Sequence, residues 1–73
     1  MRYILEAYSK EKQLFGVGMI KKGVYQSDKN AIRFMGSKAR KLLSNRSVSS
    51  VRLYKYTQLY DRSTYRLVNI FCR

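Results

Sequence analysis

The residues best suited to chemistry in this chain are cations on one side of a predicted helix. Lys29, Arg33 and Arg40 fall within about 40° of one another on a helical wheel. Like charges at this spacing repel and weaken a helix, whereas a face that needs only solubility usually mixes signs. The pattern therefore favours a surface that binds anions, phosphate above all, over a merely solvated face.

Further cations extend this surface in both directions along the chain. Residues 29–46 contain six Lys or Arg, and the acid nearest to them is Asp28. We also expect phosphate contacts from a predicted turn at residues 21–23 and from a strand cation. The candidate set is Lys21, Lys22, Lys29, Arg33, Lys38, Arg40, Lys41, Arg46 and Arg52.

A second group of candidates is aromatic and lies on predicted strands. Its members are Tyr54, Tyr56, Tyr65 and Phe71. Flat rings beside cations suit unpaired bases, because stacking is worth about 1–3 kcal/mol per base. The same residue types suit an interface between two copies of the chain, and tyrosine is also common on half-wet strands. The sequence leaves these three interpretations open.

Several kinds of chemistry are not expected. The chain has no His and one Cys, and its four acids are scattered, so no metal site, cofactor or disulfide framework is predicted. Proton-transfer catalysis near neutral pH normally uses His or a carboxylate of raised pKa, and no catalytic residue is predicted. A ribonuclease that works with Lys, Arg and Tyr alone remains an alternative. Its chemistry would be similar to that of small bacterial mRNA-cleaving toxins, whose helix-first organisation is absent here.

The elements that must position these residues follow from hydrophobic periodicity. Alternation predicts strands at 2–9, 14–21, 48–60 and 64–72. A helix is predicted from Ser27-Asp28 to Ser44-Asn45, because Ser or Asp can cap its start and its apolar residues share one side. The order is ββαββ. We expect a two-layer α+β domain with one amphipathic helix packed on a four-stranded, mainly antiparallel sheet.

One helix can cover only one face of such a sheet. Strict alternation places one set of strand residues towards the helix, namely Val51, Leu53, Val68, Ile70 and Cys72. It places another set on the uncovered face, namely Arg52, Tyr54, Tyr56, Tyr65 and Phe71. The candidate aromatics are therefore expected to point away from the helix.

Composition bounds the class of protein. The chain has 73 residues and a formal net charge of +12, and residues 38–73 hold nine Lys or Arg against one acid. We expect residues 1–73 to form one small basic domain. No secretion signal or membrane span is expected, since Glu6 interrupts the apolar N-terminal residues, and the single Cys fits a cytoplasmic location.

These observations favour a non-catalytic nucleic-acid-binding protein, with RNA slightly preferred over DNA, that pairs as a homodimer and does not bind membranes. Size, charge and the lack of modular motifs are similar in style to small accessory proteins of bacteriophages and mobile elements. The alternative is accordingly a protein that modulates an acidic host protein or a host ribonucleoprotein. A His-free endoribonuclease is the second alternative.

Overall fold

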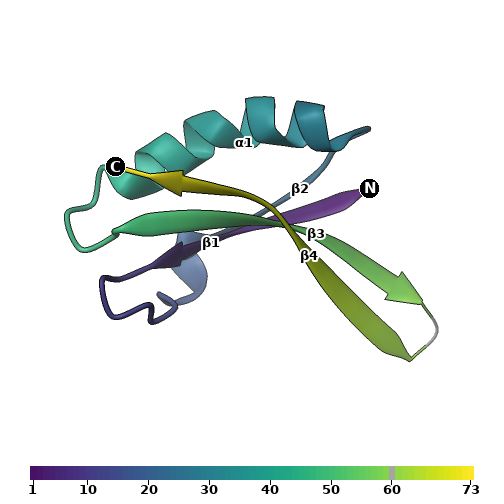
Figure 1. The fold of residues 1–73 in the computed structure, drawn as a ribbon, viewed down its shortest axis with the longest axis horizontal. Coiled ribbons are helices and arrows are strands. Elements are labelled where there is room, and N and C mark those ends of the chain that lie inside the picture. The colour runs from purple at the N-terminus through teal and green to yellow at the C-terminus, as the bar shows by residue number, and fades with distance from the viewer. Residues whose placement is uncertain (60) are drawn as a thin grey trace.

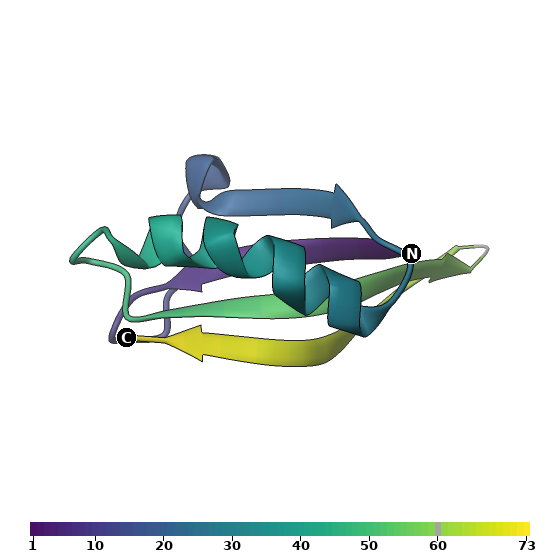
Figure 2. The ribbon, with the colours of Figure 1, turned by 90° about the horizontal axis from the view of Figure 1, so that it is seen from above.

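The sheet consists of four antiparallel strands, and one helix lies across one of its faces (Figures 1 and 2). The computed structural model describes residues 1–59 and 61–73. Its elements are β1 (Arg2–Tyr8), the 3-10 helix η1 (Val17–Met19), β2 (Ile20–Val24), α1 (Asp28–Leu43), β3 (Ser50–Leu59) and β4 (Arg62–Cys72). The strands are ordered β2-β1-β3-β4. The predicted α+β architecture and ββαββ order are confirmed.

The core lies between α1 and the two central strands, β1 and β3. Every second residue of a strand faces the same side, so these strands each bury one row of side chains under the helix. The buried apolar residues are Tyr3, Leu5, Ala7, Ala31, Met35, Ala39, Leu42, Val48, Val51 and Leu53. The small side chains of Ala31 and Ala39 let α1 approach the sheet closely. The predicted apolar side of the helix is confirmed.

Both ends of α1 are satisfied by nearby polar groups. Ser27 is the N-cap, and its Oγ accepts a hydrogen bond of 3.2 Å from the Asn30 N–H. At the other end, the Arg73 guanidinium donates to the Leu43 carbonyl at 2.6 Å and to the carbonyl of Asn45. A cation in this place also suits the negative end of the helix dipole. Arg73 thus holds the end of the helix against the end of β4.

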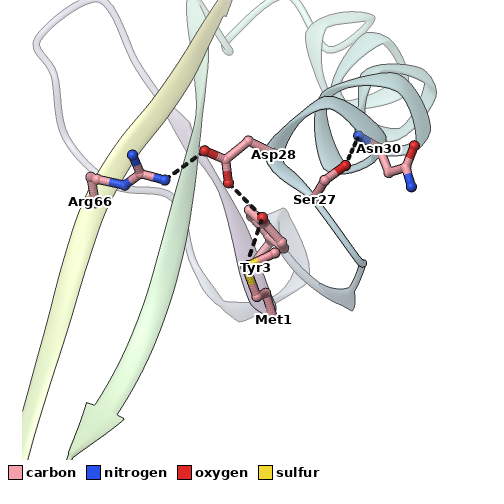
Figure 3. A network of polar contacts seen from close by, with 6 residues as sticks. All are labelled: Met1, Tyr3, Ser27, Asp28, Asn30 and Arg66. Carbon is pink, nitrogen blue, oxygen red and sulfur yellow. Dashed lines mark hydrogen bonds and ion pairs between the residues drawn. The ribbon is translucent and has the colours of Figure 1, made fainter.

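The Asp28 carboxylate joins the start of α1 to two strands (Figure 3). It accepts a hydrogen bond of 2.6 Å from the Tyr3 hydroxyl and forms an ion pair of 2.6 Å with Arg66. The Tyr3 hydrogen bond, together with Arg66, lowers the pKa of the Asp28 carboxyl. Because Tyr3 lies on β1 and Arg66 on β4, this one side chain sets where the helix begins over the sheet.

The predicted second strand at 14–21 is wrong over residues 14–19, because β2 begins only at Ile20. Leu14 forms only an isolated bridge with Tyr8, after which the chain leaves the sheet through η1. It returns at Ile20, which pairs with Glu6. The two glycines in the predicted strand fall in this excursion, Gly16 before η1 and Gly18 within it. Glycine is costly in a strand, and here the segment containing it is looped out of the sheet.

The predicted turn at residues 21–23 is also wrong, because these residues belong to β2. Lys21 pairs with Leu5 and Lys22 with Ile4, so the two lysines point to opposite faces of the sheet. Gly23 is needed for a close approach: a Cβ there would lie 2.7 Å from a ring carbon of Tyr25. The glycine therefore makes room for an aromatic ring.

A β-bulge in β4 changes which residues face the helix. Leu53 pairs with Asn69 and Tyr54 pairs with Leu67, which leaves Val68 without a partner on β3. An extra residue on one strand reverses the alternation beyond it. Past this point the hairpin of β3 and β4 turns away from the helix (Figure 1).

The bulge explains three incorrect predictions of orientation. Phe71 pairs with the buried Val51 and packs against the core, so it does not point away from the helix as predicted. Ile70 and Cys72, predicted to face the helix, lie on the other face opposite Arg52 and Ser50. On the hairpin side of the bulge, Tyr65 keeps its predicted orientation.

The remaining boundaries differ slightly from the predictions. The third strand begins at Ser50, two residues after the predicted start, while Val48 fills the core from the preceding loop. The fourth begins at Arg62, two residues before the predicted Thr64. Tyr60, at the predicted end of the third strand, lies outside the described residues.

A first prediction concerns the two glycines with close neighbours. A Cβ at Gly36, inside α1, would meet Phe71 at an ordinary contact distance of 3.8 Å. Gly36→Ala should therefore raise the free energy of unfolding by about 0.5–1 kcal/mol, because alanine restricts the unfolded chain and favours helix. Gly23→Ala should lower it, since the ring of Tyr25 must move. Denaturant unfolding of both variants tests this, and a stabilising Gly23→Ala would contradict the packing described.

A second prediction concerns the bond between Tyr3 and Asp28. Tyr3→Phe keeps the buried ring and removes the donor, so the melting temperature should fall by about 5 °C at neutral pH. The folded-state pKa of Asp28 is depressed, so its contribution exists above the unfolded pKa and disappears as pH falls through the folded value. The difference between wild type and variant should therefore vanish in acid.

At alkaline pH the same pair of proteins tests the ionisation of Tyr3 itself, and here stability is lost as the pH rises. Burial, assisted by the bond to Asp28, raises the pKa of Tyr3 to about 12, whereas an unfolded tyrosine titrates near ~10. This contribution to stability is complete below the unfolded pKa and is lost as pH rises through the folded one. Tyr3→Phe should remove that part of alkaline unfolding, and an unchanged alkaline transition would count against it.

Candidate nucleic-acid interface

The outer surface of α1 carries the cations that the sequence singled out. Lys29, Arg33, Lys38, Arg40 and Lys41 are exposed on the helix, and Arg46 is exposed in the following loop. We call these six residues the helix stripe. Lys29, Arg33 and Arg40 are aligned along its centre, whereas Lys38 and Lys41 project from α1 on the side where Phe34 lies. Among residues 1–59 and 61–73, the one ion pair joins Arg66 to Asp28, so no cation of the helix stripe is paired in that part of the chain. The positive charge of the stripe is therefore not neutralised by an ion pair among those residues.

An aromatic pair lies beside the first half of the stripe. The ring of Tyr25 stacks on that of Phe34 with 5.8 Å between centroids and 6° between planes. Phe34 is 52% exposed, and the Arg33 guanidinium lies 5.6 Å from its ring centroid. Sequence reasoning missed Tyr25, because it stands outside every periodic segment. The pair adds a flat apolar surface to the cationic helix.

The sheet face turned away from α1 is the open face. Strand register arranges it as four rows. Starting from the hairpin end, the rows are Val24, Arg2, Tyr56 and Tyr65; Lys22, Ile4, Tyr54 and Leu67; Ile20, Glu6, Arg52 and Ile70; and Tyr8, Ser50 and Cys72. Of the predicted site residues, the open face gathers Lys22, Arg52 and three tyrosines. It excludes Lys21 and Phe71.

The predicted tyrosines form a contiguous cluster on the open face. The ring centroid of Tyr65 is 5.1 Å from that of Tyr56 and 6.4 Å from that of Tyr54. The Tyr56 hydroxyl donates to Gln58 Oε1 at 3.0 Å, which holds its ring along the hairpin. Tyr65 is 56% exposed. The cluster thus presents one largely uncovered ring supported by two others.

The third and fourth rows are different, because their charges are engaged locally. The Arg52 guanidinium lies 4.4 Å from the ring centroid of Tyr8, whose hydroxyl donates to Glu6 Oε2 at 2.7 Å. Burial, and then the bond to Glu6, raises the pKa of Tyr8 above its ordinary range. Arg52 therefore lies opposite Glu6 on the neighbouring strand and over the ring of Tyr8. A contact between Arg52 and phosphate stays a prediction.

The first two rows carry cations without a facing carboxylate. Arg2 stands between Val24 and Tyr56, and Lys22 stands beside Ile4. They line a hollow of about 360 Å³. Sequence reasoning missed Arg2, because its importance depends on the register that places it beside Tyr56. Its alternation with Ile4, Glu6 and Tyr8 is the signal that could have placed it on this face.

Other kinds of site are not found in the part of the chain that the structure describes. Within residues 1–59 and 61–73, no three His, Cys, Asp or Glu side chains gather where they could hold a metal ion. No helix among those residues is both long and apolar enough to cross a bilayer. Cys72 is a free, exposed thiol.

Comparison with known proteins gives no relative: no family model, curated protein or solved structure matches this chain. The class must therefore be stated from the fold and its surfaces. It is a small α+β domain with one helix over an antiparallel sheet, a cationic helix surface and an aromatic open face.

A third prediction tests the arrangement at the far end of the open face. Glu6→Gln removes the charge that accepts from Tyr8, so the pKa of Tyr8 should fall towards its ordinary value while burial keeps it somewhat raised. The ring resonances of Tyr8 in an NMR titration measure this. Tyr3 is the internal control, because its raised pKa depends on burial and Asp28 and should stay at about 12. An unchanged pKa of Tyr8 in the variant would contradict its contact with Glu6.

Proposed function

We propose that this chain is a small, non-catalytic nucleic-acid-binding protein with two separate surfaces: the helix stripe, which holds phosphates, and the open face on the other side of the sheet, whose aromatic residues hold bases. One observation carries the proposal. Six exposed cations follow one helix and its exit, and the single acid of α1 is already bound to Tyr3 and Arg66. A group of Lys and Arg without ion pairs, with Lys29, Arg33 and Arg40 aligned at its centre, suits the negative charge of a nucleic-acid backbone.

RNA is the favoured nucleic acid. Duplex DNA is read by elements that enter a groove, whereas sequence-specific RNA recognition targets unstacked bases that lie on aromatic side chains. The cluster of Tyr54, Tyr56 and Tyr65 supports the second mode, since Tyr65 leaves more than half of its surface uncovered. Backbone binding by the helix stripe would serve either nucleic acid.

The alternative target is an acidic host protein or a ribonucleoprotein, as for an accessory protein of a phage or mobile element. The same net charge of +12 would support it. Capture of a partner before and after nuclease treatment separates the two, because a protein target is retained when nucleic acid is digested and an RNA or DNA target is not.

A fourth prediction tests the helix stripe. Binding of RNA should weaken steeply with salt, with log K falling by about 0.7–0.9 per phosphate contact for each unit of log salt. The triple variant Lys29→Gln, Arg33→Gln, Arg40→Gln should reduce the magnitude of that slope by about 2 to 3 and weaken binding to all sequences alike. Fluorescence anisotropy between about 50 and 200 mM salt measures both.

The matched control removes the same charge from elsewhere on the surface. Lys10→Gln, Lys12→Gln, Arg62→Gln changes three exposed cations that lie outside α1. This variant should keep most of the slope. Salt-independent binding by the wild type, or equal losses in the two triple variants, would refute the helix stripe as the phosphate surface.

A further inference from the structure

The hollow at the hairpin end of the open face has the size and lining of a nucleotide site. Its volume of about 360 Å³ falls at the small end of ligand pockets, which span about 300–1,000 Å³. The lining residues are Arg2, Tyr3, Ile4, Lys22, Gly23, Val24, Tyr56 and Tyr65. They come from all four strands, so the site is built on the sheet itself.

We propose that this hollow binds one unstacked nucleotide of a single strand, with its base against Tyr65 and its phosphate held by Arg2 and Lys22. The inference rests on the proposed function and deepens it, because it gives the protein a preference for single strands over duplexes. A base that remains paired and stacked inside a duplex cannot present its flat side to a ring on the sheet.

The ring that would take the base is held in place. Tyr56 supports Tyr65 at 5.1 Å and is itself tied to Gln58 through its hydroxyl. Tyr54 meets the same ring edge-on at 89°. Tyr65 nevertheless keeps 56% of its surface exposed. A ring fixed by its neighbours and open to solvent loses little freedom when a base stacks on it.

The charges at the hollow select an anionic occupant. Arg2 and Lys22 are both exposed and line it, and no Asp or Glu belongs to its lining. Glu6, the acid on the open face, stands one row further from the hollow and accepts from Tyr8. A second copy of the chain would bring another +12 to this surface. Charge complementarity therefore favours a nucleotide over self-association here.

The experiment compares single-stranded and duplex RNA of the same sequence. An RNA of about 12 nucleotides, and its blunt duplex, are titrated at fixed salt by anisotropy. Tyr65→Ala should weaken single-strand binding by about tenfold, the loss of one stacked base, and leave duplex binding on the helix stripe unchanged. Tyr65→Phe keeps the ring and should bind like wild type. Lys22→Gln should weaken single-strand binding and lower its salt slope by about one.

Leu67→Ala is the matched control, because Leu67 is 48% exposed on the open face and does not line the hollow. It should leave both affinities unchanged. If the wild type binds no nucleic acid, the proposed function itself fails. If the helix stripe binds RNA but Tyr65→Ala loses nothing, the hollow is refuted and the proposed function stands. Conversion of a dimer to a monomer by Tyr65→Ala, with strand preference unchanged, would overturn the proposal and assign the face to a second copy.

Discussion

A four-stranded sheet has two faces, and residues 1–59 and 61–73 contain one α-helix to cover them. The apolar alternation of the central strands is used on the covered side, where Leu5, Leu53 and Met35 are fully buried. The other side must remain wet or meet a partner. Its residues are accordingly mixed, with tyrosines and aliphatic side chains between cations. Because one helix covers one face, the sheet has a covered face that holds the core and an open face that is free to meet solvent or a partner.

Two of the four acids are engaged in contacts within the fold. Asp28 is used to fix the helix over β1 and β4, and Glu6 is used to hold Tyr8. Both carboxylates therefore serve internal contacts and neither neutralises the helix stripe or the hollow.

Much of the fold could be predicted from the sequence, because long periodic segments carry most of the information. The 16-residue helix has a cap, an apolar side and a defined end, and β1 and β3 alternate cleanly. Strand β2 could not be placed, since only the pairing with β1 shows that the chain loops out between Leu14 and Ile20. Phe71 was assigned to the wrong face because a strict period of two cannot anticipate the bulge at Val68.

The two candidate surfaces also differ in how far the sequence could predict them. The helix stripe depends on spacing within one element and was found from the sequence. The hollow depends on register between strands, so Arg2 went unnoticed although Tyr56 and Tyr65 were singled out.

The bulge at Val68 also gives this hairpin room to change in length. Without Val68, Asn69 and Leu67 would still pair with the consecutive residues Leu53 and Tyr54, so both faces would keep their residues. Arg66 would stay on the side of Asp28 and Tyr65 on the open face, at the cost of the contact that Val68 makes with the core. Losing or gaining a cross-strand pair nearer the hairpin tip would alter the reach of the hairpin and leave both faces intact. Length variants that preserve both surfaces are therefore those that remove the bulge residue or change the two strands together.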